Sequence, residues 1–217
     1  MSIRPAAFDQ PIYVTRPILP ALDRYMSRLS DVWDEGILTN GGTQHQEFEA
    51  ALGTYFGTRN ISLFNNGTIA MVVACQALRL TGEVITTPFT FPATPHVLSW
   101  NNITPVFADI DPQTMNIDPS NIEALINSRT SAILGVHLYG TPCDVEGIQN
   151  IADRHGLQVV YDGAHAFGTR LNGRLVTEFG DATMLKFVCC PSTLPRGSVP
   201  DASTIGWVVC CAPPAIS

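Results

Sequence analysis

The stretch SAILGVHLYGTPCDVEGIQNIADRHGLQVVYD, residues 131–162, decides the fold class. Its two ends, SAILGVHLY and LQVVYD, are apolar and rich in β-forming residues. Between them lies DVEGIQNIADRHG, which has the character of a helix and begins at Asp144, a residue type that caps helix starts. A strand, a helix and a second strand in this order predict two neighbouring parallel strands.

The same alternation continues on both sides of this stretch. The further β-rich runs are NISLF, EVITTP, PVFADI and ATMLKF, and the helix-like runs between them are GTIAMVVACQALRL, TPHVLSW and PSNIEALI. Asp118 followed by Pro119 offers a capping carboxylate and a proline at the first helical position. The sequence therefore predicts an α/β fold with a mainly parallel sheet and helices on both faces.

The chain divides into three segments of different character. Residues 1–58 are expected to form an N-terminal arm with two helices joined by the loop LTNGGTQH, and residues 59–187 the sheet domain. Residues 188–217 contain five prolines, four cysteines and two charged residues, and they show no strand or helix period. We expect this last segment to be an aberrant, unstructured tail.

Composition excludes several classes of protein. With 217 residues and 45% hydrophobic content, the chain can bury the core of one large domain. A formal net charge of -7 disfavours nucleic acid and anionic membrane surfaces as partners. The first residues lack an apolar signal core and no run is long enough to span a bilayer, which favours a soluble cytoplasmic protein. Six unevenly spaced cysteines favour reduced thiols, and no metal site is expected.

The first candidate binding segment is FNNGTIA, residues 64–70. In an open parallel sheet, ligands bind beyond the carboxyl ends of the strands, and this segment joins a strand to a helix at that edge. The amides of Gly67 and Thr68, with the Thr68 hydroxyl, would form an anion cradle at the helix start. The alternative is an ordinary turn between a strand and a helix.

Two further segments reach the same edge. In TTPFTFPAT, residues 86–94, Phe89 or Phe91 is expected either to stack on a planar ring or to pack in the core. In VVYDGAHAFG, residues 159–168, Asp162 ends an apolar strand, so that its carboxylate either pairs with a protonated ring nitrogen or caps the next turn. His165 follows three residues later, either as a site residue or as a structural histidine.

Six motifs together resemble one known family, and in chain order they are NNGTIA, EVITTPFTFPAT, PVFADIDPQTMNID, LGVHLYGTPCDV, VVYDGAHAFG and GDATML. They resemble the DegT/StrS-type sugar aminotransferases, which are pyridoxal phosphate (PLP) enzymes of the aspartate aminotransferase fold, or PLP-dependent transferase fold type I. The similarity runs from about Ile12 to Leu185. It implies the large domain of that fold in incomplete form, without the small C-terminal domain.

The resemblance also assigns roles to individual residues. It implies that Asp162 pairs with the pyridinium nitrogen, that Gly67 and Thr68 bind the phosphate, that Phe91 is the stacking ring, and that His165 contacts the phenolic oxygen of the cofactor. In the loop LTNGG, it implies that Thr39, Asn40 and Gly41 border the substrate pocket. The implied reaction passes an amino group from a donor such as glutamate to a keto group of a nucleotide-linked sugar. The implied assembly is a homodimer in which two subunits complete each site.

One departure from the family concerns the lysine that forms the Schiff base with the cofactor. The family continues this strand with Ser-Phe-His-x-x-Lys, but here Lys186, the only lysine in the sequence, stands at the serine position and Pro191 stands at the lysine position. A shift of five residues exceeds what rotamers can absorb, so Lys186 is rejected as the catalytic lysine. The resemblance therefore implies an aminotransferase homologue that is inactive in this form.

Two alternatives remain. The first is a catalytically dead PLP-fold protein with a binding or regulatory role. The second is a dinucleotide-binding domain, which ranks last because no G-x-G-x-x-G follows the first strand. The abrupt loss of similarity after Leu185 is typical of a shifted reading frame or an unspliced intron. The family's seventh strand, which lies between strands one and six, is expected to be missing, leaving two unpaired strand edges.

Overall fold

The computed structural model describes residues 20–39, 41–186 and 207–211, and its helices and strands alternate as the sequence predicts. The α-helices are α1 (Leu22–Glu35), α2 (Thr43–Phe56), α3 (Gly67–Ala77), α4 (Ala93–Trp100) and α5 (Val145–His155). The strands are β1 (Ile61–Phe64), β2 (Glu83–Thr86), β3 (Thr104–Phe107), β4 (Thr130–Val136), β5 (Gln158–Gly163), β6 (Arg170–Leu171), β7 (Arg174–Leu175), β8 (Ala182–Lys186) and β9 (Trp207–Cys211). Single 3-10 turns lie at Pro119–Asn121, Glu123–Leu125, Leu138–Gly140 and Val176–Glu178.

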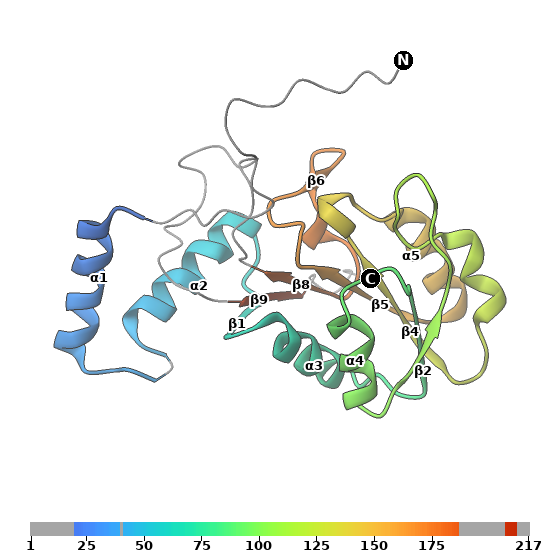
Figure 1. Ribbon diagram of the computed structural model, residues 1–217, viewed down its shortest axis with the longest axis horizontal. Coiled ribbons are helices and arrows are strands. Elements are labelled where there is room, and N and C mark those ends of the chain that lie inside the picture. The colour runs from blue at the N-terminus through green and yellow to red at the C-terminus, as the bar shows by residue number, and fades with distance from the viewer. Residues whose placement is uncertain (1–19, 40, 187–206, 212–217) are drawn as a thin grey trace, which may run out of the picture.

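Seven strands form one sheet in the order β1-β9-β8-β5-β4-β2-β3 (Figure 1). The pairs from β8 through β5, β4 and β2 to β3 are all parallel, whereas β9 runs antiparallel to both of its neighbours. The short strands β6 and β7 form a separate hairpin. The prediction of a mainly parallel α/β sheet is therefore confirmed, and the carboxyl ends of its parallel strands meet at one edge.

The strand β9 corrects two expectations about the segment 188–217. Trp207–Cys211 pairs with β1 on one side and β8 on the other, so that Cys210 lies opposite both Ile61 and Thr183. The predictions of no strand in this segment and of a missing strand between the first and the sixth are wrong for these residues. WVVCC is a short apolar run with two valines and an aromatic residue, which suits a central strand, but the surrounding prolines obscured it. Residues 187–206 and 212–217 lie outside the described part of the chain.

Alternate residues of the strands pack in two separate cores on opposite faces of the sheet. Val84, Leu134 and Val160 point to the face that α3 and α4 cover, where they pack with Met71 and Leu98. Their neighbours in sequence point to the opposite face, which α5 covers, and this second core includes Ile85, Ile133, Tyr161 and Ile148. Because apolar residues occupy both sides of these strands, helices must cover both faces, as predicted.

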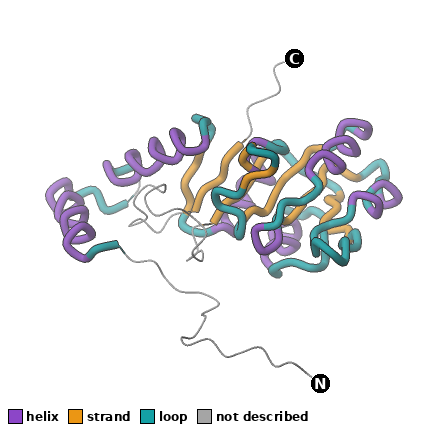
Figure 2. Tube along the Cα trace, turned by 90° about the horizontal axis from the view of Figure 1, so that it is seen from above, coloured by secondary structure: helices purple, strands orange, loops and turns teal. Residues whose placement is uncertain are grey.

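The N-terminal helices are related to the sheet in different ways. Phe48, Leu52 and Phe56 of α2 form a third apolar cluster with strand residues that include Ile61 and Leu185. In contrast, α1 has no buried residue, and both views place it at one end of the molecule, beyond α2 (Figures 1 and 2). The two predicted helices of the arm are present, and one of them contributes nothing to the described core.

Local signals set several element boundaries. The Asp144 carboxylate accepts a hydrogen bond from the Gly147 amide at 2.9 Å, which confirms it as the cap of α5. The Asp118 carboxylate likewise accepts from the Ser120 amide at 2.8 Å, although the run that follows forms 3-10 turns instead of one α-helix. Among the described helices, none is long and apolar enough to cross a membrane.

Candidate active site

Asp162 lies near the end of β5, where burial and hydrogen bonds hold its carboxylate in place. Its side chain is only 6% exposed, and its Oδ2 accepts a hydrogen bond from the Thr94 hydroxyl at 2.8 Å. Its Oδ1 accepts from the Ala164 amide at 3.1 Å. The Thr94 hydroxyl is also 2.8 Å from that of Thr90, so that a chain of hydroxyl groups reaches the carboxylate from the start of α4. Sequence reasoning missed Thr94, because Thr90 lies in a bend before α4 begins and no helical spacing links the two threonines.

The burial of Asp162 has an electrostatic consequence. Removal from water disfavours the charged carboxylate and raises its pKa, although the hydrogen bonds from Thr94 and Ala164, the charge of Lys186 and that of His165 when protonated act in the opposite direction. Burial prevails. A cation in direct contact with the carboxylate would reverse this balance, and the protonated nitrogen of a pyridine ring is such a cation. The environment of Asp162 therefore fits the ring of PLP.

The start of α3 has the geometry of an anion site. Asn66 caps the helix, because its Oδ1 accepts from the Ile69 amide at 2.8 Å and its carbonyl accepts from the Ala70 amide at 3.2 Å. These bonds leave the amides of Gly67 and Thr68 without an acceptor inside the helix. Residues of α3 and α4 pack with Val160 of β5 in one core. The two helices therefore lie on the same face of the sheet, and α4 contains Thr94. A phosphate at this helix start suits both the free amides and the helix dipole.

The two phenylalanines before α4 are both exposed, and neither is a core residue. Phe91 is 71% exposed and Phe89 is 43% exposed. Phe91 belongs to the turn that begins α4, where its carbonyl accepts from the Thr94 amide at 3.0 Å. Phe91 is thus one turn away from the threonine that binds Asp162. Its role as the stacking ring stays a prediction.

His165 is held by a residue that the sequence analysis did not assign. Its Nδ1 accepts a hydrogen bond from the Tyr139 amide at 3.4 Å, and the two rings stack with centroids 5.8 Å apart and an angle of 11°. The His165 ring is exposed to solvent at the carboxyl edge of the sheet, three residues after Asp162. Its predicted contact with the cofactor stays a prediction, and its position is compatible with one.

Beneath the site, a buried histidine supports the end of β4. The His137 amide donates to the Asp162 carbonyl at 3.0 Å, and its Nδ1 accepts from the Cys143 amide at 3.1 Å. Its ring stacks on Tyr161 with centroids 4.5 Å apart, and burial lowers its pKa to about 4. His137 is therefore neutral at physiological pH and helps to hold the strand end that carries Asp162.

Lys186 lies at the carboxyl end of β8, the strand that neighbours β5. It is partly buried, and its charge is close enough to lower the pKa of Asp162. The only lysine of the chain is therefore close to the candidate site, at the position that the family fills with serine. Its rejection as the lysine that anchors the cofactor stays a prediction.

The loop between α1 and α2 does not lie beside Asp162 and the other candidate site residues. Thr39 and Gly41 are exposed, and the Gly41 carbonyl accepts from the Gln46 side chain at 2.7 Å. Both views place this loop at the α1 end of the molecule, away from the strand that carries Asp162 (Figures 1 and 2). Asn40, the third predicted substrate residue, lies outside the described residues. The role of this loop in substrate binding stays a prediction.

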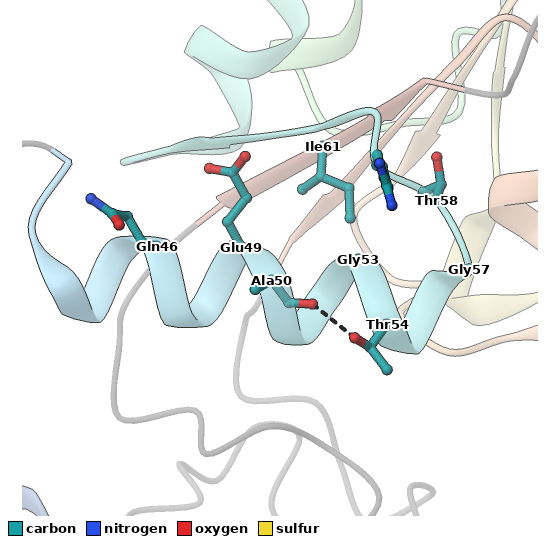
Figure 3. Close-up of a pocket in the computed structure, with 9 residues that line it drawn as sticks. Gln46, Glu49, Ala50, Gly53, Thr54, Gly57, Thr58 and Ile61 are labelled. Atoms are coloured by element: carbon teal, nitrogen blue, oxygen red, sulfur yellow. Dashed lines mark hydrogen bonds between the residues drawn. The ribbon is translucent and has the colours of Figure 1, made fainter.

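A cavity of about 620 Å³ lies elsewhere, between α2 and the start of β1 (Figure 3). Its polar side chains include Glu49, Thr54 and Arg59, and the Thr54 hydroxyl donates to the Ala50 carbonyl at 3.0 Å. None of the predicted site residues lines it. Within the described ranges, no group of three or more His, Cys, Asp or Glu side chains is arranged to hold a metal ion.

Comparison with known proteins gives the arrangement its context. The model of the DegT/DnrJ/EryC1/StrS aminotransferase family matches residues 22–190. The chain belongs to this family. It is 54% identical over 165 residues to a dTDP-4-amino-4,6-dideoxy-D-glucose transaminase of Escherichia coli, covering 76% of this chain and 44% of the relative. A Shigella dysenteriae protein of the same name is 49% identical, covering 82% of this chain and 49% of that one.

Solved structures of similar proteins share the fold. DesI, solved in the presence of its TDP-sugar product, superposes with a TM-score of 0.82 at 39% identity, covering 96% of this chain and 51% of DesI. NtdA of Bacillus subtilis, solved with the cofactor PMP bound, gives a TM-score of 0.74 at 29% identity, with coverage of 88% and 42%. The family uses PLP, and the fold is that of the PLP-dependent transferases, as predicted. The chain spans about half the length of the curated relatives that it matches.

Proposed function

We propose that the protein contributes the cofactor-binding part of a PLP-dependent aminotransferase that acts on a nucleotide-linked keto sugar, with an amino-acid donor such as glutamate. The observation that carries this proposal is the buried Asp162 carboxylate, held by Thr94 and Ala164 at the edge where α3 also begins. Relatives named for dTDP-sugar and GDP-sugar chemistry support the substrate class.

Each described residue has a defined task in this proposal. PLP supplies an electron sink and carries the amino group. Asp162 accepts the hydrogen bond of the protonated ring nitrogen and keeps the proton there. The amides of Gly67 and Thr68 would bind the phosphate, and Phe91 would stack on the ring. His165 would donate a hydrogen bond to the phenolic oxygen of the cofactor.

We further propose that this chain does not complete a catalytic cycle. Its only lysine is Lys186, which stands five positions before Pro191, where the family motif places lysine. The alternative to an aminotransferase is a catalytically dead protein that binds the cofactor in a binding or regulatory role. The proline at the position of the family's lysine favours this alternative. Without a lysine at this position, the chain has no anchoring amine for the cofactor there.

Titration of the full chain with PLP, followed by absorbance, tests the cofactor proposal. We expect weak, reversible binding that Asp162→Asn reduces and that Asp153→Asn does not change, since Asp153 is an exposed residue of α5 with the same charge. Borohydride should leave no stoichiometric adduct. Equal binding by wild type and Asp162→Asn would refute the proposed site, whereas one-to-one modification of Lys186 would refute its rejection.

We also propose that the protein forms a homodimer and that α1 lies at the contact. Leu22 and Trp33 on one side of α1 are each 74% exposed, and no residue of this helix is buried. A second copy would cover this side and would bring the loop containing Thr39 to a site in the other subunit. Sedimentation of the full chain should show dimers that Trp33→Glu weakens and that Ser27→Glu, on the polar side, preserves. A monomer at all accessible concentrations would contradict this proposal.

A further inference from the structure

The turn Leu138–Gly140 is strained and yet firmly held. Tyr139 has a φ of 51°, a left-handed conformation that costs a non-glycine residue about 1 kcal/mol or more. Its side chain is 76% exposed, so that burial in the core does not compensate for the strain. The ring contact that the structure gives Tyr139 is the stack on His165, with an interplanar angle of 11°. A strained residue that presents both its amide and its ring to one histidine suggests a positioning role.

Asn116 fixes this turn from below. Its side chain is 2% exposed, and its Oδ1 accepts from the Leu138 amide at 3.0 Å. Its Nδ2 donates to the carbonyls of Thr141 and Pro142, both at 3.0 Å. One buried amide group therefore holds the backbone on both sides of Tyr139. Because these bonds satisfy the Asn116 amide, the turn cannot relax without leaving a buried polar group unpaired.

The backbone of His165 is also in contact with the turn. Gly140 has a φ of +83°, and a Cβ built on it would lie 3.2 Å from the His165 carbonyl oxygen. A side chain at this position would therefore push the turn away from His165 as well as strain its backbone. The close approach brings the Tyr139 amide to the Nδ1 of His165.

We propose that Tyr139 is a positioning residue that fixes His165 in one orientation and one tautomer. A neutral imidazole carries a single proton, and the nitrogen that accepts a hydrogen bond is the one without it. Since Nδ1 accepts from the Tyr139 amide, the proton is on Nε2. His165 thus presents a hydrogen-bond donor to the site, and the chemistry that it recognises is an oxygen acceptor, such as a phenolate or a carbonyl. This inference rests on the proposed function only for the identity of that acceptor.

Two pairs of variants test the assignment in the full chain without cofactor. His165→Asn places an oxygen at the same distance from the backbone as Nδ1, whereas His165→Gln removes the acceptor from that position. We expect deuterium exchange at the Tyr139 amide to stay slow in His165→Asn and to become about five- to tenfold faster in His165→Gln, as the loss of one hydrogen bond predicts. Equal exchange rates in wild type and His165→Gln would overturn the proposal.

The second pair acts on Tyr139 itself. Nitrogen-15 shifts of the His165 ring, measured at about pH 9 so that ordinary histidines are neutral, report the tautomer. We expect an unprotonated Nδ1 in wild type and in Tyr139→Phe, which keeps the ring. Tyr139→Gly relieves the strain but loses the stack. In this variant the shifts of the two His165 ring nitrogens should move toward each other. A protonated Nδ1 in wild type, or unchanged shifts in Tyr139→Gly, would show that Tyr139 does not position His165.

A third arm separates this inference from the proposed function. With PLP added, His165→Asn should bind it less tightly than wild type, because the donor at the Nε2 position is gone. If wild type itself does not bind PLP, the proposed function fails while the exchange and tautomer results still decide the role of Tyr139. If binding is equal in wild type and His165→Asn, the donor role of His165 is wrong.

Discussion

Replacing Asp162 with asparagine should separate the stability of the protein from its affinity for cofactor. The asparagine Oδ1 can still accept from the Ala164 amide, which is 3.1 Å from the carboxylate in wild type. Its Nδ2 then faces the Thr94 hydroxyl, which can turn its proton toward Thr90 at 2.8 Å and accept instead. No buried polar group is left unpaired, so without cofactor the free energy of unfolding should not fall by more than about 1 kcal/mol.

The pH dependence of the same variant has a defined sign. Burial raises the pKa of Asp162 in the folded state above its value in the unfolded chain. The folded state then binds more protons between these two pKa values, so wild type loses stability as pH rises from about 3.9 through the raised pKa. Asp162→Asn lacks this contribution. Without cofactor, the stability of the variant relative to wild type should therefore increase with pH across this window.

Cofactor should stabilise wild type more than it stabilises Asp162→Asn. Loss of a hydrogen bond between charged groups costs about 1.5–3 kcal/mol, which corresponds to about 10- to 150-fold weaker binding of PLP. At a PLP concentration of about 100 times the wild-type Kd, wild type gains about 2.7 kcal/mol of stability. A variant that binds about 50-fold more weakly gains about 0.6 kcal/mol under the same conditions.

Urea unfolding with and without PLP measures both effects, with Asp153→Asn as the matched charge control. Two results would refute the reasoning. One is unchanged PLP stabilisation in Asp162→Asn. The other is a loss of well over 1 kcal/mol without cofactor at neutral pH, which would mean that the carboxylate is needed for folding.

Further predictions concern the supports of the site. Asn116→Ala should lower the free energy of unfolding by about 2–4 kcal/mol, because the Leu138 amide and two carbonyls lose a buried partner; a loss below about 1 kcal/mol in urea unfolding would contradict this. Burial lowers the pKa of His137 to about 4, so that the folded state binds fewer protons than the unfolded chain. Stability should therefore decline as pH falls from about 6.5 toward 4, and less so in His137→Asn. Burial raises the thiol pKa of Cys75 to about 11 and of Cys143 to about 12, so neither should react with a thiol reagent at neutral pH until the protein unfolds.

The features that sequence reasoning found are those encoded locally. An apolar run that ends in Asp162 places a carboxylate at the carboxyl edge of a parallel sheet whatever the rest of the fold contains. The Asp144 cap and the start of α3 at Gly67 likewise depend on a few adjacent residues. The two helix starts can be read from the sequence because each cap is satisfied within one turn of backbone.

The features that it missed depend on distant partners. Thr94 and Asp162 are 68 residues apart, and Tyr139 and His165 are 26 residues apart, so that neither pair has a local signature. Asn116 has the same character, since it bonds residues more than 20 positions away. The strand β9 was missed for another reason: prolines on both sides gave its segment the composition of a loop.

The position of β9 also governs when the sheet can be completed. Among the described strands of this sheet, β1 is synthesised first and β8 more than 100 residues later, yet the two are joined only through β9, which is synthesised after both. Until residues 207–211 are available, the part of the molecule around β1 has no strand through which to bond to the rest of the sheet. Contacts of such long sequence separation slow folding, and the open edges of β1 and β8 are exposed to other chains in the meantime. The time that a new molecule spends at risk of association is thus set by the arrival of β9.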